Sequence, residues 1–243
     1  MIMSCIKSEC MKIFSLKKYK VIIAVTLLLN IFGVLIGKLP KSIISISMKN
    51  YPFTIISVCA YVVIPFMAFM LASSLISGEC EKNQMKLLVT RHIERSNILI
   101  GKLGAIFIYL SALLAANTFV AVVLSTISSG LNSFSLIKVI MSFIITLLPI
   151  LTIVSFAGFI SVLCKGSSSA LGLSIVSYGG FVLIKLILSG LGSIIFAGYL
   201  AIFKMVIGNT VPIFGFICGI VVLLCWVIIF IFAASLKFER KEF

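Results

Sequence analysis

The chain has 243 residues, of which 62% are hydrophobic and 11% are charged, with a formal net charge of +14 at pH 7. Soluble domains carry about 25% charged residues, so this composition predicts a membrane protein whose apolar surface is covered by lipid. The positive charge does not indicate nucleic-acid binding, because the lysines stand at the ends of apolar runs and form no continuous basic face.

The first 20 residues precede the apolar runs and are rich in lysine. Apolar side chains recur there at helical spacing, which predicts an amphipathic helix lying in the membrane interface over residues 1–20. A disordered basic tail is the alternative. The apolar stripe consists of Met3, Ile6, Cys10, Ile13 and Phe14.

Residues 21–243 are predicted to form one transmembrane domain of six helices, so the fold is all-α and integral to the membrane. Each run is near the 20 or so helical residues that cross a bilayer, and the runs are continuously apolar rather than alternating, which disfavours a β-barrel. No cleavage site follows the first run, so we expect it to be a retained span. The predicted spans are 21–36, 53–77, 98–127, 139–163, 169–188 and 213–236.

Six spans put both termini on the same side of the membrane, and the basic residues indicate which side. With both ends in the cytoplasm, the inner segments hold 14 Lys and Arg residues and the outer segments hold 5. Because cytoplasmic loops are enriched in Lys and Arg, we expect both termini to be cytoplasmic.

The segment 189–212 is apolar, but it is interrupted by four glycines and Pro212 and carries Lys204. Such breakers are costly in an uninterrupted span, and non-helical backbone at membrane depth must be shielded by protein or water. We therefore expect two short half-helices that re-enter the membrane from its outer face. The alternative is an outer loop with a seventh, broken crossing, which would place the C-terminal tail outside, against the charge rule.

Lys185 is the one charge well inside a predicted span. An isolated ammonium at the bilayer centre costs about 2.5–3.5 kcal/mol on insertion scales. The side chain either snorkels toward the outer surface or lines a water-filled translocation path, and both interpretations stay open.

The residue types needed for intramembrane catalysis are missing. The chain has no aspartate and one histidine, and none of its six glutamates lies in an apolar run. Intramembrane proteases, metal-dependent transferases and proton relays need clusters of these side chains, and a gradient-driven carrier is disfavoured for the same reason. No G-x-x-x-x-G-K-[ST] occurs, so the chain cannot cradle ATP phosphates by itself. We expect a protein that is not an enzyme and binds no metal or cofactor.

The charged residues concentrate in the segment 77–103, between the second and third predicted spans. It holds three of the six acids, two of the three arginines and the only histidine. A short helix from Lys82 to Val89, with acids near its start, is predicted there. Held between two spans, it would act as a lever that tilts both. The alternative is an ordinary solvated loop that obeys the positive-inside rule.

This segment carries a recognisable pattern, in which a Glu is followed by the core Lys86-Leu87-Leu88-Val89-Thr90-Arg91. The pattern resembles the type-2 ABC transporter permease family, whose members have a Lys-Leu-Leu-x-Thr-Arg-Pro core followed by an Arg and a Lys. Asn83-Gln84 stand where the family often has Gly-Thr, and His92 stands where it has Pro. The other matching residues are Ser77, Gly78, Glu79, Glu81, Lys82, Ile93, Arg95, Ile98, Leu99 and Lys102.

The resemblance implies the membrane-spanning permease subunit of an ATP-driven exporter in the plasma membrane of a bacterium. A cytosolic ABC ATPase subunit would use the ATP and would dock on the short cytoplasmic coupling helix. A second permease chain, identical or related, would complete the transporter. The residues implied in ATPase coupling are Glu79, Glu81, Lys82, Lys86, Thr90, Arg91 and Arg95.

The small size and the lack of a large outer domain resemble the subfamily that expels, or gives immunity to, antimicrobial peptides such as lantibiotics and bacitracin. Sodium, small drugs and lipid-linked glycans stay open as cargo, as does the direction of transport. A second class of function also stays open: a non-transporting membrane scaffold or sensor component that binds a cytosolic partner through residues 78–97. A neighbouring gene for an ATPase would favour the transporter.

Overall fold

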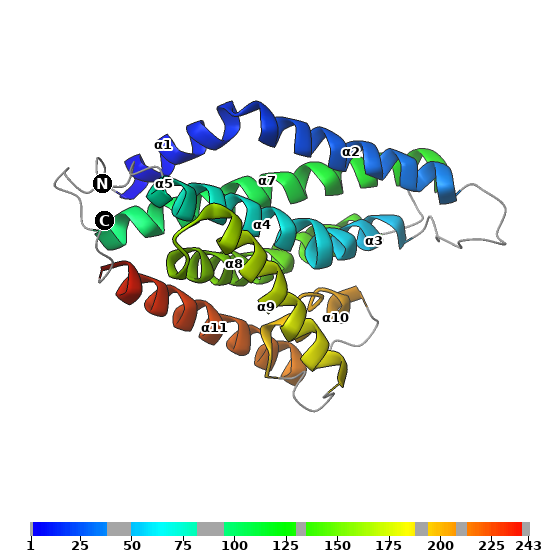
Figure 1. Cartoon of the computed structure of the whole chain (residues 1–243). Helices are drawn as coiled ribbons and strands as arrows, with labels where there is room; N and C mark the ends of the chain where they lie inside the picture. Colours follow the sequence, from blue (N-terminus) through cyan, green and yellow to red (C-terminus); the bar gives the residue numbers. More distant parts are fainter. Residues whose placement is uncertain are drawn as a thin grey trace.

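The computed structural model describes residues 2–37, 50–81, 95–129, 135–187, 194–207 and 213–239. These residues are mostly helical, and no strand occurs among them (Figure 1). The elements are α1 (Ile2–Ser15), α2 (Lys17–Gly37), α3 (Tyr51–Val58), η2 (Cys59–Val63), α4 (Ile64–Ala72), η3 (Ser73–Ser77), α5 (Gly78–Glu81), α7 (Arg95–Ser129), α8 (Leu136–Leu163), α9 (Ser167–Ile187), η6 (Phe196–Gly198), α10 (Lys204–Ile207) and α11 (Ile213–Glu239).

Among the described residues, five helical stretches are long and apolar enough to cross a membrane, which agrees with the predicted all-α fold of a multi-pass membrane protein. A shorter apolar stretch, Tyr19–Gly33, lies in α2, where the first span is predicted. The sixth crossing is therefore a prediction beyond this count. The five stretches are Tyr51–Glu81, Asn97–Ile127, Leu136–Leu163, Ser167–Ile187 and Ile213–Glu239.

The N-terminal helix packs on the start of α7 and runs in the same direction. A Cβ added at Gly101 would lie 3.1 Å from Cβ of Cys5, and the Phe14 ring centroid is 5.5 Å from that of Tyr109. The helix breaks at Leu16, so α2 begins at Lys17 rather than at residue 21. The interfacial placement of residues 1–20 stays a prediction.

Polar side chains join α2 to α7 inside the apolar bundle. The Nδ2 amide of Asn30 donates to Oδ1 of Asn117 and, at 3.2 Å, to the carbonyl of Thr26. Tyr51 Oη donates to the carbonyl of Asn30 at 2.5 Å. In lipid such bonds hold helices together, because the alternative is an unpaired polar group in hydrocarbon.

The stretch Tyr51–Glu81 is one continuous helix that contains two π-helical turns, η2 and η3. Pro65 is the second residue of α4, which follows η2, and it has no N–H to donate to the carbonyl of Tyr61, four residues earlier. That carbonyl accepts a hydrogen bond from Tyr178 Oη of α9 at 3.1 Å. The turn thus provides a contact between the second and fifth predicted spans.

The core is built around α8, which packs against α11, α4 and α7 (Figure 1). Phe156 of α8 lies at its centre, with ring centroids 5.2 Å from Phe230, 5.8 Å from Phe181 and 6.0 Å from Phe69. By contrast, only a small part of α9 is buried, so much of its apolar surface faces outward.

The described part of the predicted re-entrant segment, residues 194–207, contains two short helical pieces, η6 and α10. Phe196, Leu200 and Phe203 are fully buried, and Trp226 Nε1 donates to the carbonyl of Ile194 at 2.9 Å. Gly219 of α11 permits this packing, because a Cβ there would lie 2.6 Å from Ile202. Protein therefore shields this broken backbone, as a re-entrant segment requires, while its depth in a membrane stays a prediction.

The start of α1, the short helix α5 and the end of α11 lie at one end of the bundle, and α10 lies toward the other (Figure 1). The two described ends of the chain therefore lie at the same end of the bundle (Figure 1), while the six-span count and the side of the membrane stay predictions. The predicted coupling helix falls in residues 82–94, outside the described residues.

Candidate functional site

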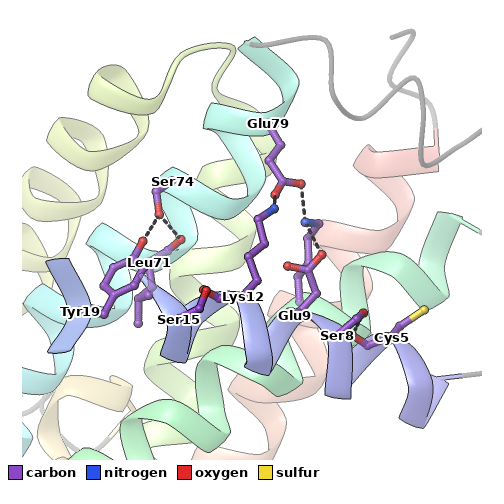
Figure 2. A network of polar contacts seen from close by, with 10 residues as sticks. Cys5, Ser8, Glu9, Lys12, Ser15, Tyr19, Leu71, Ser74 and Glu79 are labelled. Carbon is purple, nitrogen blue, oxygen red and sulfur yellow. Dashed lines mark hydrogen bonds and ion pairs between the residues drawn. The ribbon is translucent and has the colours of Figure 1, made fainter. Parts of the chain in front are cut away.

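Four charged side chains meet where α1, α5 and α7 come together, and we call them the four-charge cluster: Glu9, Lys12, Glu79 and Lys102. Figure 2 labels the first three of them. The Nζ atom of Lys102 donates to Oε2 of Glu79 at 2.5 Å and to Oε1 of Glu9 at 3.1 Å. Lys12 Nζ donates to Oε1 of the same Glu79. Glu79 thus bridges two lysines from two helices.

The cluster is buried on one side and open on the other. The side chain of Lys102 has no exposed surface, and those of Glu79, Glu9 and Lys12 are 6%, 15% and 47% exposed. Two positive and two negative charges balance, which is the condition under which buried charges are tolerated. Among the described residues, Oε2 of Glu9 has no hydrogen-bond partner, so the buried part of the cluster is not fully satisfied.

The local sequence explains why these charges meet. Glu9 and Lys12 are three residues apart, so they lie on one face of α1. The small side chains of α7 let that face approach closely, because a Cβ at Gly104 would lie 3.2 Å from Cδ1 of Ile6. Lys102 stands between the two glycines 101 and 104 of α7, and its side chain therefore meets Glu9.

The environment shifts two pKa values on α1. Burial alone would lower the pKa of Lys12, but the hydrogen bond and negative charge of Glu79 outweigh it and raise that pKa. Burial, and then the nearby charge of Glu9, raise the pKa of the Cys10 thiol. Lys12 is therefore charged at neutral pH, and Cys10 is a thiol rather than a reactive thiolate.

A second acid ties the same short helix to α9. Oε2 of Glu81 accepts a hydrogen bond from the backbone N–H of Ser167, the first residue of α9, at 3.0 Å. A carboxylate is favourable at that position because the first N–H groups of a helix have no partner within it. Ser77 Oγ adds a bond to the carbonyl of Ser161 in α8 at 2.7 Å. The end of the second span is thus fastened to four other helices.

The structure places the residues of the predicted coupling site as follows. Glu79 and Glu81 lie in α5 and are engaged within the chain. Arg95 begins α7, with its side chain outside the described residues. The other predicted residues, Lys82, Lys86, Thr90 and Arg91, lie outside the described residues.

Lys185, the predicted path residue, is half-buried near the far end of α9. Its Nζ lies 5.6 Å from the ring centroid of Tyr61 and donates to the carbonyl of Ala197 at 3.4 Å. It is therefore close to residues 194–207 rather than to the four-charge cluster, and both interpretations of Lys185 stay predictions.

The sequence analysis did not single out Glu9 or Lys12 as site residues. A signal was available: Glu9 is the only acid before residue 79, and it stands in a helix that is otherwise basic and apolar. Among the described residues, no group of three or more His, Cys, Asp or Glu side chains is placed to hold a metal ion.

Comparison with known proteins gives one family. A family model described as "Protein of unknown function (DUF2705)" matches residues 40–243. No curated protein gives a significant match. The matched region begins after α2, so it includes Glu79 and Lys102 of the four-charge cluster but not Glu9 or Lys12.

Proposed function

We propose that this chain, which belongs to the DUF2705 family, is the permease subunit of an ATP-driven exporter. In this proposal a cytosolic ABC ATPase binds the segment 78–97, and a second permease chain, identical or related, completes the transporter. The resemblance of residues 77–102 to the type-2 ABC permeases supplies the hypothesis. The four-charge cluster is the observation that carries it further.

The cluster supports the proposal because it joins both ends of the segment to a third helix. Glu79 lies just before residues 82–94 and Lys102 lies just after them, and the two side chains are 2.5 Å apart at Oε2 and Nζ. Glu9 and Lys12 of α1 bond to the same pair. A force applied between residues 82 and 94 would therefore reach α1 and α7 together, because separating these helices would expose unpaired buried charge.

The contacts of Glu79 and Glu81 separate the predicted coupling residues into two groups. The carboxylate of Glu79 is almost wholly buried, and that of Glu81 holds the start of α9. Both are suited to positioning the lever within this chain. Direct contact with the ATPase then falls to Lys82, Lys86, Thr90, Arg91 and Arg95.

The length of α7 supports placing the cluster outside the hydrocarbon, and the positive-inside rule assigns it to the cytoplasmic side in our proposal. The 35 residues of α7 extend about 52 Å at 1.5 Å per residue, against about 30 Å of hydrocarbon. One or both ends of α7 must therefore leave the hydrocarbon. In our topology α2 completes six spans, both termini are cytoplasmic, and the first turns of α7 protrude into the cytoplasm with Lys102.

For the cargo, we propose an antimicrobial peptide or a similar amphiphile, so that the transporter would serve immunity or resistance in a bacterial plasma membrane. The support is the resemblance to the type-2 ABC permeases together with the predominantly apolar helices. A scaffold or sensor that binds a cytosolic partner without transport is the second candidate, and it would use the same cluster.

The test is photo-cross-linking from residue 91 in living cells. A benzophenone amino acid at Arg91 should cross-link a protein whose sequence contains a nucleotide-binding motif. The same probe at Lys138, at the start of α8, should not. Cross-linking from residue 91 only to proteins without such a motif would refute the transporter and favour the scaffold.

For the cargo, deletion of the gene should sensitise the cell to lantibiotics or bacitracin. Unchanged susceptibility to such peptides would refute that part of the proposal.

A further inference from the structure

Charge is segregated along this molecule. All six carboxylate side chains belong to residues 9, 79, 81, 94, 239 and 242, and none occurs between residues 95 and 238. The described acids lie in α1, in α5 and at the end of α11, at one end of the bundle (Figure 1). The lysines near α10 lie at the other end of the bundle, away from the described acids (Figure 1).

Three of these lysines come from three helices: Lys138 and Lys185 contact the segment 194–207, and Lys204 belongs to it. Lys138 of α8 donates to the carbonyl of Ile207 at 3.2 Å, and Lys185 of α9 donates to the carbonyl of Ala197 at 3.4 Å. Lys204 begins α10, and its Nζ lies 5.9 Å from the Tyr61 ring centroid, which Lys185 approaches to 5.6 Å. We call Lys138, Lys185 and Lys204 the lysine triad.

The partners of the triad are neutral. Backbone carbonyls and an aromatic face offset part of an ammonium charge, but they supply no negative charge. A cavity of about 500 Å³ opens beside Lys204, large enough for a ligand headgroup. Its lining combines hydroxyl and amide groups with the ammonium: Asn50, Phe53, Thr54, Ser57, Lys204 and Ile207.

We propose that the lysine triad and this cavity bind the phosphate headgroup of an anionic membrane phospholipid. One observation favours a lipid over a free anion. The apolar side chains next to the triad face outward, with Leu186, Ile187 and Ile194 exposed by 72%, 77% and 59%. Acyl chains can cover these side chains while the phosphate lies at the lysines.

The proposal does not depend on the ATPase. A lipid bound between α8, α9 and α10 would stabilise the re-entrant segment in a transporter or in a scaffold. Its failure and the failure of the proposed function are therefore separate results.

The test is native mass spectrometry of the full chain released from detergent. Phosphatidylglycerol and phosphatidylcholine with the same acyl chains are titrated, and sn-glycerol 3-phosphate serves as the soluble headgroup. We expect phosphatidylglycerol to bind more tightly than phosphatidylcholine. Each lysine of the triad should contribute about fivefold, so Lys138→Gln, Lys185→Gln and Lys204→Gln together should weaken phosphatidylglycerol about 100-fold.

A matched control removes three exposed lysines far from α10: Lys7→Gln, Lys17→Gln and Lys20→Gln. This variant should keep the preference for phosphatidylglycerol, and a triple Lys→Arg variant of the triad should keep it as well. Equal binding of the two lipids, or an equal loss in the control, would overturn the site. Competition by glycerol phosphate at the same concentration as the lipid would overturn the choice of a lipid.

Discussion

Replacing Lys102 with methionine tests the four-charge cluster most directly. Methionine keeps an unbranched apolar stem but removes the ammonium, which leaves Glu9 and Glu79 with only Lys12 between them. Because Lys102 has no exposed surface, water cannot compensate. Removing one partner of a buried pair costs about 3–5 kcal/mol. The same change at Lys12, whose side chain is 47% exposed, should cost about 0–1 kcal/mol.

The assay is thermal unfolding in detergent, followed by the fluorescence of the single tryptophan, Trp226. This residue lies in the aromatic core, 5.0 Å from the Phe230 ring centroid, and reports loss of packing. At about 2–4 °C per kcal/mol for a chain of this size, Lys102→Met should lower the midpoint by roughly 6–20 °C. Lys12→Met should lower it by a few degrees at most.

A double variant separates charge imbalance from loss of packing. Adding Glu79→Gln to Lys102→Met leaves Glu9 and Lys12, which balance. The double variant should therefore cost less than the sum of the single changes, by about 1–3 kcal/mol. Equal costs for Lys102→Met and Lys12→Met, or strict additivity of the two changes, would refute the buried cluster.

Three further predictions concern packing, a backbone contact and pH. Gly219→Ala should cost about 1–3 kcal/mol because the new Cβ would lie 2.6 Å from Ile202, whereas Gly179→Ala, with nothing within 4 Å, should be neutral or stabilising; equal midpoints would contradict the close packing. Tyr178→Phe should lower the stability by about 1 kcal/mol, because it removes the hydrogen bond to the Tyr61 carbonyl. The loss should be smaller in a Pro65→Ala background, because residue 65 then has an N–H that can donate to the same carbonyl. An equal loss in both backgrounds would contradict the role given to Pro65. The pKa of Lys12 in the folded state is raised above 10.5, so the contribution of Lys12 to stability is fully present below pH 10.5 and is lost as pH rises through the folded-state pKa. The difference in unfolding midpoint between wild type and Lys12→Met should therefore not change between about pH 7 and 9. A change in that range would contradict the charge pairing.

Hydropathy alone is sufficient to predict the all-helical, multi-pass character, because each apolar run must satisfy its own backbone hydrogen bonds within a helix. The four-charge cluster, by contrast, could not be predicted from hydropathy. The cluster needs Glu9 and Lys102, which are 93 residues apart, and their pairing depends on how closely α1 approaches the glycines of α7. A pattern of neighbouring residues in the sequence does not show how closely these two helices approach.

The segment 194–207 gives a second example. Its glycines and proline predicted two half-helices that re-enter the membrane, and this stays a prediction; the structure has two short helical pieces there, η6 and α10. The sequence did not indicate that Phe196 and Phe203 would be fully buried, because burial depends on α11 approaching through Gly219. The π-helical turns were also not predicted, although Pro65, which has no backbone N–H, indicates irregular hydrogen bonding near Tyr61.

The separation of 93 residues between Glu9 and Lys102 also sets an order of events during synthesis. At about 5–20 residues per second, the ribosome needs roughly 5–19 s to make the lysine after it has made the glutamate. During that interval the newly made helix has no partner on α7, and its predicted amphipathic character suits it to the bilayer surface. Its docking is therefore a late step of biogenesis, and it fastens the bundle only after the third hydrophobic segment has begun to emerge.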